Sequence, residues 1–479
     1  MKYLNPIVLA DYSDPDLLRV GDDFYMVSSS FHFNPGIPIL HSKDLVHWEL
    51  VNYVVDKLIP GFEKVRPGHG IWAPSIREHN GNYYCLVPYP DEGIYVYKSD
   101  DILGKWKLHS QLLVGPGYED PCPAWIGNKA YVVFAFVKSR IGFHNKLAII
   151  EVDEDLKVKI TNDYQVIFDG DEYGVVDIEG PKFYLEGEYI HILAPQGGVK
   201  YGNQLDLRSK DIYGPYEMKV VLDQNDSDIN GPHQGGLVPI HDNHYAFIHF
   251  QDKDNVGRIL RLEPVELINH WFIMGDATTP VVEGEISLKE VILSIDYEDN
   301  FKGKINKIWQ TPCVLNNIDS WIKVSDIGLE MNVMKRKEDA IFLEPYVLTQ
   351  KVSGFHLKYE VEIDVSGLEE GEMAGLGIIG ENSSLVMVKK EEDKCYLYAV
   401  SDYEGNFIER KGQLVPSKTK LTIEWHNPEE ARVYIDEDSI ISHVVTKEKW
   451  VGLRVGLFAL CENEPKGKVI FSNFTIKTA

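Results

Sequence analysis

Three acidic motifs contain the residues best suited to catalysis. They are Ser13-Asp14-Pro15-Asp16, Glu119-Asp120-Pro121-Cys122 and Ile178-Glu179-Gly180-Pro181. When carboxyl groups lie close together, repulsion raises the pKa of at least one, while hydrogen bonds or a cation keep another ionised. A protonated acid near an ionised carboxylate is what the cleavage of a glycosidic bond requires. Asp14, Asp120 and Glu179 are therefore candidate catalytic residues.

Two simpler interpretations compete with this one. Asp-Pro and Gly-Pro are common turn dipeptides, so each acid could serve only its own turn. A cluster of acids could also bind a hard cation. The closely spaced D-x-D-x-D pattern of a calcium loop is absent from the sequence, which argues against a purely structural metal site.

A fivefold repeat places the three acids in equivalent positions. A turn of Gly, Asn or Asp followed by a short apolar and aromatic strand recurs at intervals of 47 to 59 residues, a length that fits four short strands. Five such units predict a five-bladed β-propeller. The markers are Tyr25, Tyr84, Tyr131, Ile190 and Tyr245. The residues eleven positions before them are Asp14, Ala73, Asp120, Glu179 and Gln234.

In a propeller, equivalent positions on the innermost strands converge on one central channel, so we expect the three acids to meet there. Phe31 and Trp72 are close to these positions in sequence and could stack on a sugar, or pack in the core. Arg258 could bind a hydroxyl group and keep a carboxylate ionised. His233 could be a core histidine, a hydrogen-bond partner or an ion ligand.

Composition argues against two classes of partner. The chain has 479 residues and a formal net charge of −26, which disfavours nucleic acid and membrane partners. Five scattered cysteines predict free thiols in a reducing compartment: Cys85, Cys122, Cys313, Cys395 and Cys461. The first residues contain no apolar run typical of a signal peptide, so we expect a cytoplasmic protein.

The second part of the chain has a different pattern. The repeat stops after Gly275, and residues 276–291 read as a linker or as a strand returning over the propeller. From about residue 295, alternating stretches such as 355–361 and 420–425 predict a β-sandwich. The expected organisation is all-β, with a propeller over residues 1–290 and a sandwich over residues 295–479.

Segments from every predicted blade resemble glycoside hydrolase family 43, especially its β-xylosidase and α-L-arabinofuranosidase branch. The matching stretches are residues 5–48, 70–84, 117–125, 177–184, 231–238 and 257–275. Related retaining enzymes that act on fructosides have a Cys after the acidic Glu, whereas Gly180-Pro181 follows here, which favours the inverting family.

The resemblance implies a role for each candidate residue. Asp14 matches the general base, Asp120 the residue that orients the acid and modulates its pKa, and Glu179 the general acid. The matching substrate-binding residues are Phe31, Trp72, His233 and Arg258. The chemistry needs no cofactor, although the resemblance also implies a calcium ion or water near His233.

The C-terminal part resembles the concanavalin-like jelly roll of the same branch, through residues 299–301, 309–310, 374–377 and 455–459. In relatives this domain closes one side of the active site, which favours attack on chain ends. Its closing strand, residues 469–474, lacks the acids that help to hold calcium in relatives, so calcium in this domain is doubtful.

Three functions remain open at this point. The first is an exo-acting β-1,4-xylosidase, with or without α-L-arabinofuranosidase activity. The second is an arabinan-directed exo-hydrolase. The third is a non-catalytic carbohydrate-binding propeller, which would have no use for a protonated acid opposite an ionised one. The expected partner is a xylo- or arabino-oligosaccharide, and a homo-oligomer is left open.

Overall fold

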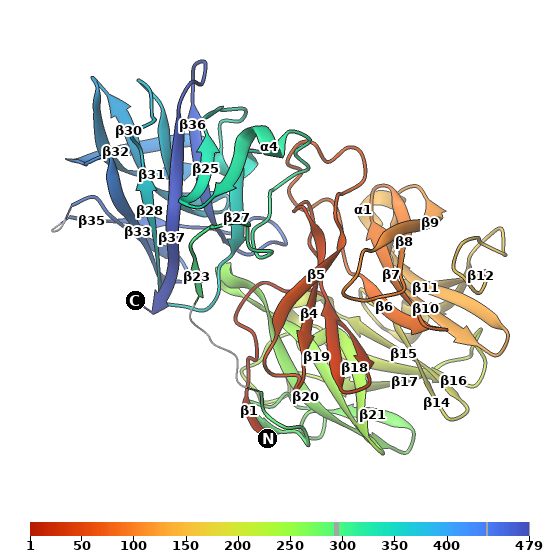
Figure 1. Ribbon diagram of the computed structural model, residues 1–479. Helices are drawn as coiled ribbons and strands as arrows, with labels where there is room; N and C mark the ends of the chain where they lie inside the picture. The colour runs from red at the N-terminus through yellow and green to blue at the C-terminus, as the bar shows by residue number, and fades with distance from the viewer. Residues whose placement is uncertain (292–296, 437–438, 479) are drawn as a thin grey trace.

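The structure is a computed structural model of the chain that describes residues 1–291, 297–436 and 439–478. It consists of two β-rich domains that lie side by side, with short helices in a few connections (Figure 1). The helices are α1 (Lys138–Ile141), α2 (Gly170–Tyr173), α3 (Gly198–Tyr201), α4 (Ile318–Trp321), η1 (Asp254–Val256) and η2 (Ile341–Leu343). None of the helices in these residues is long and apolar enough to cross a membrane.

The first domain is a β-propeller of five blades, each a four-stranded antiparallel sheet built from consecutive strands. The first two blades are β2 (Asp16–Val20), β3 (Asp23–Val27), β4 (Gly36–Ser42) and β5 (Glu49–Val55), then β6 (Ser75–His79), β7 (Asn82–Tyr89), β8 (Gly93–Ser99) and β9 (Lys107–Val114). The third and fourth are β10 (Tyr118–Ile126), β11 (Lys129–Phe136), β12 (Lys146–Val152) and β13 (Gln165–Asp169), then β14 (Lys182–Glu186), β15 (Tyr189–Gln196), β16 (Asn203–Ser209) and β17 (Glu217–Leu222). The fifth is β18 (His233–His241), β19 (His244–Lys253), β20 (Gly257–Ile268) and β21 (Trp271–Met274).

The predicted repeat is confirmed. All five marker residues lie at the second or third position of the second strand of their blades, β3, β7, β11, β15 and β19. Around the axis, β2 contacts β18 and β6, and β10 contacts β6 and β14, while β18 also contacts β15 of the fourth blade. The positions eleven residues before the markers therefore fall at the inner start of each blade, and this geometry brings distant parts of the chain together.

Apolar side chains fill the space between neighbouring blades, as in the cluster shared by the third and fourth blades. One buried ion pair also joins the first two blades. The Asp16 carboxylate accepts hydrogen bonds from the Arg77 guanidinium at 2.7 Å and from the Ile76 N–H at 2.8 Å. Asp16 follows Asp14 by two residues, yet it holds blades together and does not face the cavity described below.

The second domain is a β-sandwich, as predicted. One sheet contains, in spatial order, β24 (Ile322–Ser325), β25 (Gly328–Asn332), β37 (Lys468–Thr478), β28 (Leu357–Asp364), β33 (Lys418–Asn427), β34 (Glu430–Tyr434) and β35 (Ile440–Val444), with β23 (Tyr297–Asp299) on β37. The other contains β26 (Met334–Lys335), β36 (Arg454–Cys461), β29 (Met373–Ile379), β30 (Asn382–Glu391), β31 (Lys394–Tyr403) and β32 (Asn406–Leu414), with β27 (Val347–Lys351) on β36. Their facing side chains form one large apolar core.

The connection between the domains begins as a returning strand. Within residues 276–291, β22 (Glu283–Glu285) pairs with β1 (Lys2–Leu4) at the start of the chain. The expected start of the sandwich at residue 295 lies outside the described residues. The domains also touch directly, because Asn34 of the propeller pairs with Thr311 of the second domain.

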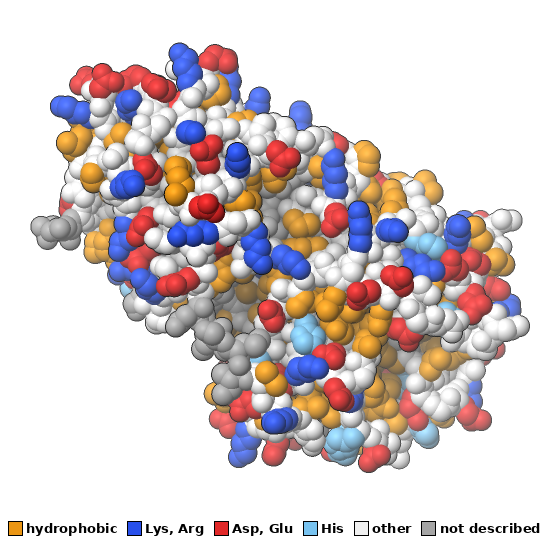
Figure 2. Space-filling view, viewed as in Figure 1, with side chains coloured by type: hydrophobic (Ala, Val, Ile, Leu, Met, Phe, Trp, Pro, Cys, Tyr) orange, Lys and Arg blue, Asp and Glu red, His pale blue; other side chains and the backbone are white. Residues whose placement is uncertain are grey.

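All five cysteines are free, and four of them are buried. On the surface, Figure 2 shows acidic and basic side chains interspersed over both domains on the face in view.

Candidate active site

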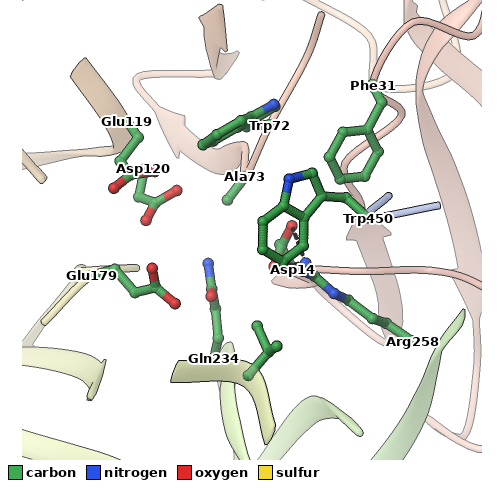
Figure 3. Close-up of a pocket in the computed structure, with 11 residues that line it drawn as sticks. Asp14, Phe31, Trp72, Ala73, Glu119, Asp120, Glu179, Gln234, Arg258 and Trp450 are labelled. Carbon is green, nitrogen blue, oxygen red and sulfur yellow. Dashed lines mark hydrogen bonds and ion pairs between the residues drawn. The ribbon is translucent and has the colours of Figure 1, made fainter. Parts of the chain in front are cut away.

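A cavity lies at one end of the propeller axis, where the first strands begin. Each blade contributes at least one residue to its wall, and the second domain contributes one (Figure 3). The lining residues are Asp14, Phe31, Trp72, Ala73, Glu119, Asp120, Glu179, Val199, Gln234, Arg258 and Trp450. The three acids predicted from the repeat are therefore brought together in one cavity, with Phe31, Trp72 and Arg258 beside them.

The backbone at the start of the blades is unusual in a repeating way. Asp14, Asp120 and Gln234, which occupy equivalent positions in three blades, all have positive φ values, at 53°, 54° and 57°. Residues other than glycine seldom adopt this backbone conformation, and backbone strain of this kind is common at functional sites. We infer that this local turn directs these side chains into the axial cavity.

Asp14 is held in place by two polar partners. It is 6% exposed, and its carboxylate accepts hydrogen bonds from the Ser29 hydroxyl and from the Arg258 guanidinium, the latter at 3.2 Å. A buried carboxylate paired with a guanidinium is stabilised in its ionised form. Asp14 is therefore suited to accept a proton.

Arg258 is itself fixed by parts of both domains. Its guanidinium lies 4.8 Å from the centre of the Phe250 ring and 5.4 Å from that of Trp450. The buried Asp11 carboxylate accepts hydrogen bonds from the backbone N–H groups of Arg258, at 2.8 Å, and of Gly452 in the second domain, at 2.9 Å. One side chain thus ties the cavity arginine to the loop that contains Trp450.

Asp120 and Glu179 lie across the cavity from Asp14 in Figure 3. Burial, and then the negative charge of Asp120, raise the pKa of Glu179 to about 8. Burial, and then Asp14, raise the pKa of Asp120 to about 7, although a hydrogen bond from the Gly180 N–H at 2.7 Å opposes this shift. Glu179 therefore holds a proton at neutral pH, and it lies across the cavity from Asp14, which is paired with Arg258.

The motif around Glu179 needs its glycine. Gly180 has a φ of 55°, and a Cβ atom at this position would lie 2.9 Å from Pro195 and 3.0 Å from the Gln234 side chain. Because the Gly180 N–H bonds the Asp120 carboxylate, the turn that follows Glu179 is anchored to the neighbouring blade. Asp120 consequently fixes the position of Glu179 as well as its charge state.

Aromatic rings form the apolar walls. Phe31 and Trp72, from the first two blades, pack with Trp450 and Val451 of the second domain in one small cluster. The backbones of Phe31 and Ile71 exchange two hydrogen bonds, at 2.8 and 2.9 Å. Gly70 permits this close approach, since a Cβ atom there would meet the Phe31 carbonyl oxygen at 2.1 Å. The walls are flat and apolar, as a sugar-binding pocket requires.

His233 is completely buried, and its neighbour Gln234 is the residue of this motif that lines the cavity. No described residue forms a hydrogen bond with either ring nitrogen of His233, and burial lowers its pKa to about 3, so it is neutral. Calcium takes six to eight oxygen ligands. Among the described residues, the group of carboxylates that could bind such an ion is formed by Glu119, Asp120 and Glu179 and does not include His233. Calcium near His233 therefore remains a prediction.

Sequence reasoning named Ala73 and Gln234 only as positions in phase with the repeat, and it did not identify Glu119, Val199 or Trp450. Glu119 stands beside Asp120 in the same motif, but alternation along a strand places neighbours on opposite faces. Gln234 occupies the position in phase with the repeat, whereas its neighbour His233 has the more versatile side chain. Trp450 lies in the second domain, and no local pattern relates it to the propeller.

A propeller whose axis presents a protonated acid opposite a stabilised carboxylate, between aromatic walls, has the site of a glycoside hydrolase. Residues 3–272 match the family described as "Glycosyl hydrolases family 43", and the chain belongs to this family. Residues 298–477 match the "Beta xylosidase C-terminal Concanavalin A-like domain". The resemblance inferred from the sequence motifs is confirmed.

Named relatives align with this chain over different lengths. A protein named "Beta-xylosidase" from Formosa agariphila is 27% identical, with 99% of this chain and 90% of the relative aligned. A "Non-reducing end alpha-L-arabinofuranosidase" from Bacteroides ovatus is 32% identical over 228 residues, which are 46% of this chain and 41% of that protein. The solved structure of a bifunctional family 43 protein from Bacteroides eggerthii has a TM-score of 0.85 and 25% identity, and this chain spans 64% of its length.

Proposed function

We propose that this protein is an exo-acting, inverting glycosidase that releases single xylose units from the non-reducing ends of β-1,4-linked xylo-oligosaccharides. The observation that carries the proposal is the placement of Glu179, whose pKa is raised to about 8, across one cavity from the Arg258-paired Asp14. A non-catalytic binding propeller gains nothing from this arrangement.

In the proposed reaction, Glu179 protonates the leaving oxygen while Asp14 removes a proton from a water molecule on the opposite face of the sugar. Inversion needs the two carboxyl groups about 6.5–9.5 Å apart, which leaves room for that water. Asp120 positions Glu179 through Gly180 and, by its charge, raises the pKa of the acid. Arg258 pairs with the Asp14 carboxylate and contributes a donor for a sugar hydroxyl.

The walls of the cavity support attack on chain ends. Phe31 and Trp72 form one part of the wall, and Trp450 of the second domain lies against them. A pocket closed by two domains accommodates a terminal sugar more readily than the middle of a polysaccharide.

An α-L-arabinofuranosyl substrate is the second candidate. Xylose and arabinofuranose present similar hydroxyl patterns, and one relative carries the name of an arabinofuranosidase. The same acid, base and aromatic walls would serve both sugars, so the two substrates are expected to compete for one site.

The first test compares substrates and products. We expect turnover of 4-nitrophenyl β-D-xylopyranoside, with the α-L-arabinofuranoside as the second substrate, because the acid–base pair suits both. Proton NMR in the first minutes should show α-xylose before mutarotation, since inversion converts a β-linkage into the α-anomer. Initial release of β-xylose would exclude the inverting mechanism, and no turnover of any pentoside would favour a binding module.

The pH dependence supplies another prediction. Because the general acid must be protonated, kcat/KM should fall as the pH rises above about 8, the pKa to which Glu179 is raised. Asp120→Asn removes the negative charge beside Glu179. Without that charge, ionised Glu179 is more stable and its pKa is lower, so the fall in kcat/KM, the basic limb of the profile, should begin at a lower pH. Asp163→Asn, an exposed site in the third blade, should leave the limb unchanged. A limb that stays in place in Asp120→Asn would contradict the electrostatic role of Asp120.

A further inference from the structure

A fourth carboxyl group in the cavity has no role in the mechanism above. Glu119 lines the cavity wall, is 8% exposed and directly precedes Asp120. In Figure 3 its carboxyl group lies on the same side of the cavity as Asp120 and Glu179. Oxygen atoms of these three carboxyl groups lie within 4.8 Å of one another.

A local irregularity explains why two consecutive acids share one cavity. The pairing of β10 with β11 slips between Glu119 and Cys122, and Asp120 has a φ of 54°. Successive residues of a regular strand point to opposite faces, whereas a bulge re-aims one of them. The bulge therefore adds Glu119 to the cavity that the repeat assigns to Asp120.

No described group of the protein donates a hydrogen bond to the Glu119 carboxyl, and this residue lines the cavity. Arg140, whose charge lowers the pKa of Glu119, forms its ion pair with Asp91 at 3.0 Å. A molecule that enters the cavity can therefore supply a hydrogen-bonding partner for Glu119.

The charge state of Glu119 follows from its surroundings. Burial raises its pKa well above the usual value, and Asp120, Glu179 and Asp14 raise it further. A neutral carboxylic acid offers one O–H donor and one carbonyl acceptor. A sugar hydroxyl can engage both, because it is itself a donor and an acceptor.

We propose that Glu119 is a specificity-determining residue whose carboxyl group exchanges hydrogen bonds with one hydroxyl group of the sugar in the cavity. This inference rests on the proposed glycosidase function and adds a direct contact with the substrate. It also gives the cavity a means of distinguishing sugars by the position of one hydroxyl, because a buried polar group left without a partner is costly.

The test pairs variants of Glu119 with substrates that lack one hydroxyl. For 4-nitrophenyl β-D-xylopyranoside, Glu119→Ala should lower kcat/KM about tenfold, the effect of one hydrogen bond between neutral groups. Glu119→Gln, which keeps a donor and an acceptor without charge, should stay within about threefold of the parent. Glu172→Ala, an exposed change on α2, serves as the control.

The 2-, 3- and 4-deoxy derivatives of this substrate then locate the contact. The parent should lose about tenfold in kcat/KM on one derivative beyond the loss that Glu119→Ala shows on the same compound. Equal losses in parent and variant on all three derivatives would overturn the proposal. An ionised Glu119 would also overturn it, and would appear as a shift of the basic pH limb in Glu119→Gln or as Ca²⁺ binding that Glu119→Gln abolishes.

These outcomes separate this proposal from the proposed function. If the parent hydrolyses no pentoside, the glycosidase proposal fails. The contact is then tested by the binding of xylose and arabinose, followed through the total tryptophan fluorescence, because Trp72 and Trp450 line the cavity. Binding that Glu119→Ala weakens and Glu119→Gln retains would support the contact. Equal binding by the parent, Glu119→Ala and Glu119→Gln would reject the proposed contact.

Discussion

Glu179→Gln should lower kcat on xylo-oligosaccharides by about 10²- to 10⁴-fold, the range that general acid catalysis contributes. A sugar alkoxide is a poor leaving group and needs the proton that Glu179 holds at neutral pH. A 2,4-dinitrophenyl glycoside needs little protonation, so the same variant should lose far less on it. The variant should also lack the decline of kcat/KM above pH 8 on the activated substrate. Steady-state kinetics on both classes of substrate over pH 5 to 10 would measure these effects.

The matched control is Glu188→Gln, an exposed change in the turn between β14 and β15 of the same blade. It should leave kinetics and the melting temperature unchanged. If Glu179→Gln lost activity equally on oligosaccharides and activated aryl glycosides, Glu179 would not be the proton donor.

Asp14→Asn should lower kcat about 10²- to 10⁴-fold on both classes of substrate alike. Water must be activated whatever group leaves, and an amide cannot accept the proton that the Asp14 carboxylate can. Arg258 also loses its ionised partner in this variant, so its orientation is expected to suffer as well. The measurement is kcat on oligosaccharide and aryl substrates, with thermal melting to show that the variant folds.

Asp22→Asn, an exposed change in the β2–β3 turn, is the control for Asp14→Asn. A variant of Asp14 that remained active on activated substrates alone would show a dependence on the leaving group, which belongs to an acid. That result would reverse the assignment of the two carboxyl groups.

The sequence was sufficient to predict the architecture because the propeller repeats a short signal. A turn followed by an aromatic residue such as Tyr25 or Tyr84 marks the second strand of each blade, and equal offsets then identify the strand starts near the axis. This geometry is set by the fold, so Asp14, Asp120 and Glu179 could be placed together although they are far apart in the chain.

The remaining parts of the site depend on features that have no periodic signal. The bulge at Asp120 adds Glu119 to the cavity, and a single irregular residue in a strand is invisible to a pattern of alternation. Trp450 reaches the cavity through the docking of two domains, which depends on surface complementarity and on Asp11. Gln234 lies eleven residues before the marker Tyr245, as the repeat requires, but an amide side chain is a weaker indication of function than the imidazole of His233.

The contribution of Trp450 to the cavity wall has a consequence for how the protein is made. Translation proceeds from the N-terminus, and domains generally fold as units as they emerge. All five blades are complete at Met274, whereas Trp450 and Gly452 belong to the segment before β36. The Asp11 carboxylate, near the start of the chain, accepts a hydrogen bond from the Gly452 N–H. This bond can form only after the segment that contains Gly452 has been synthesised. A ribosome-bound chain with a finished propeller would therefore have its catalytic acids in place but an unfinished pocket wall.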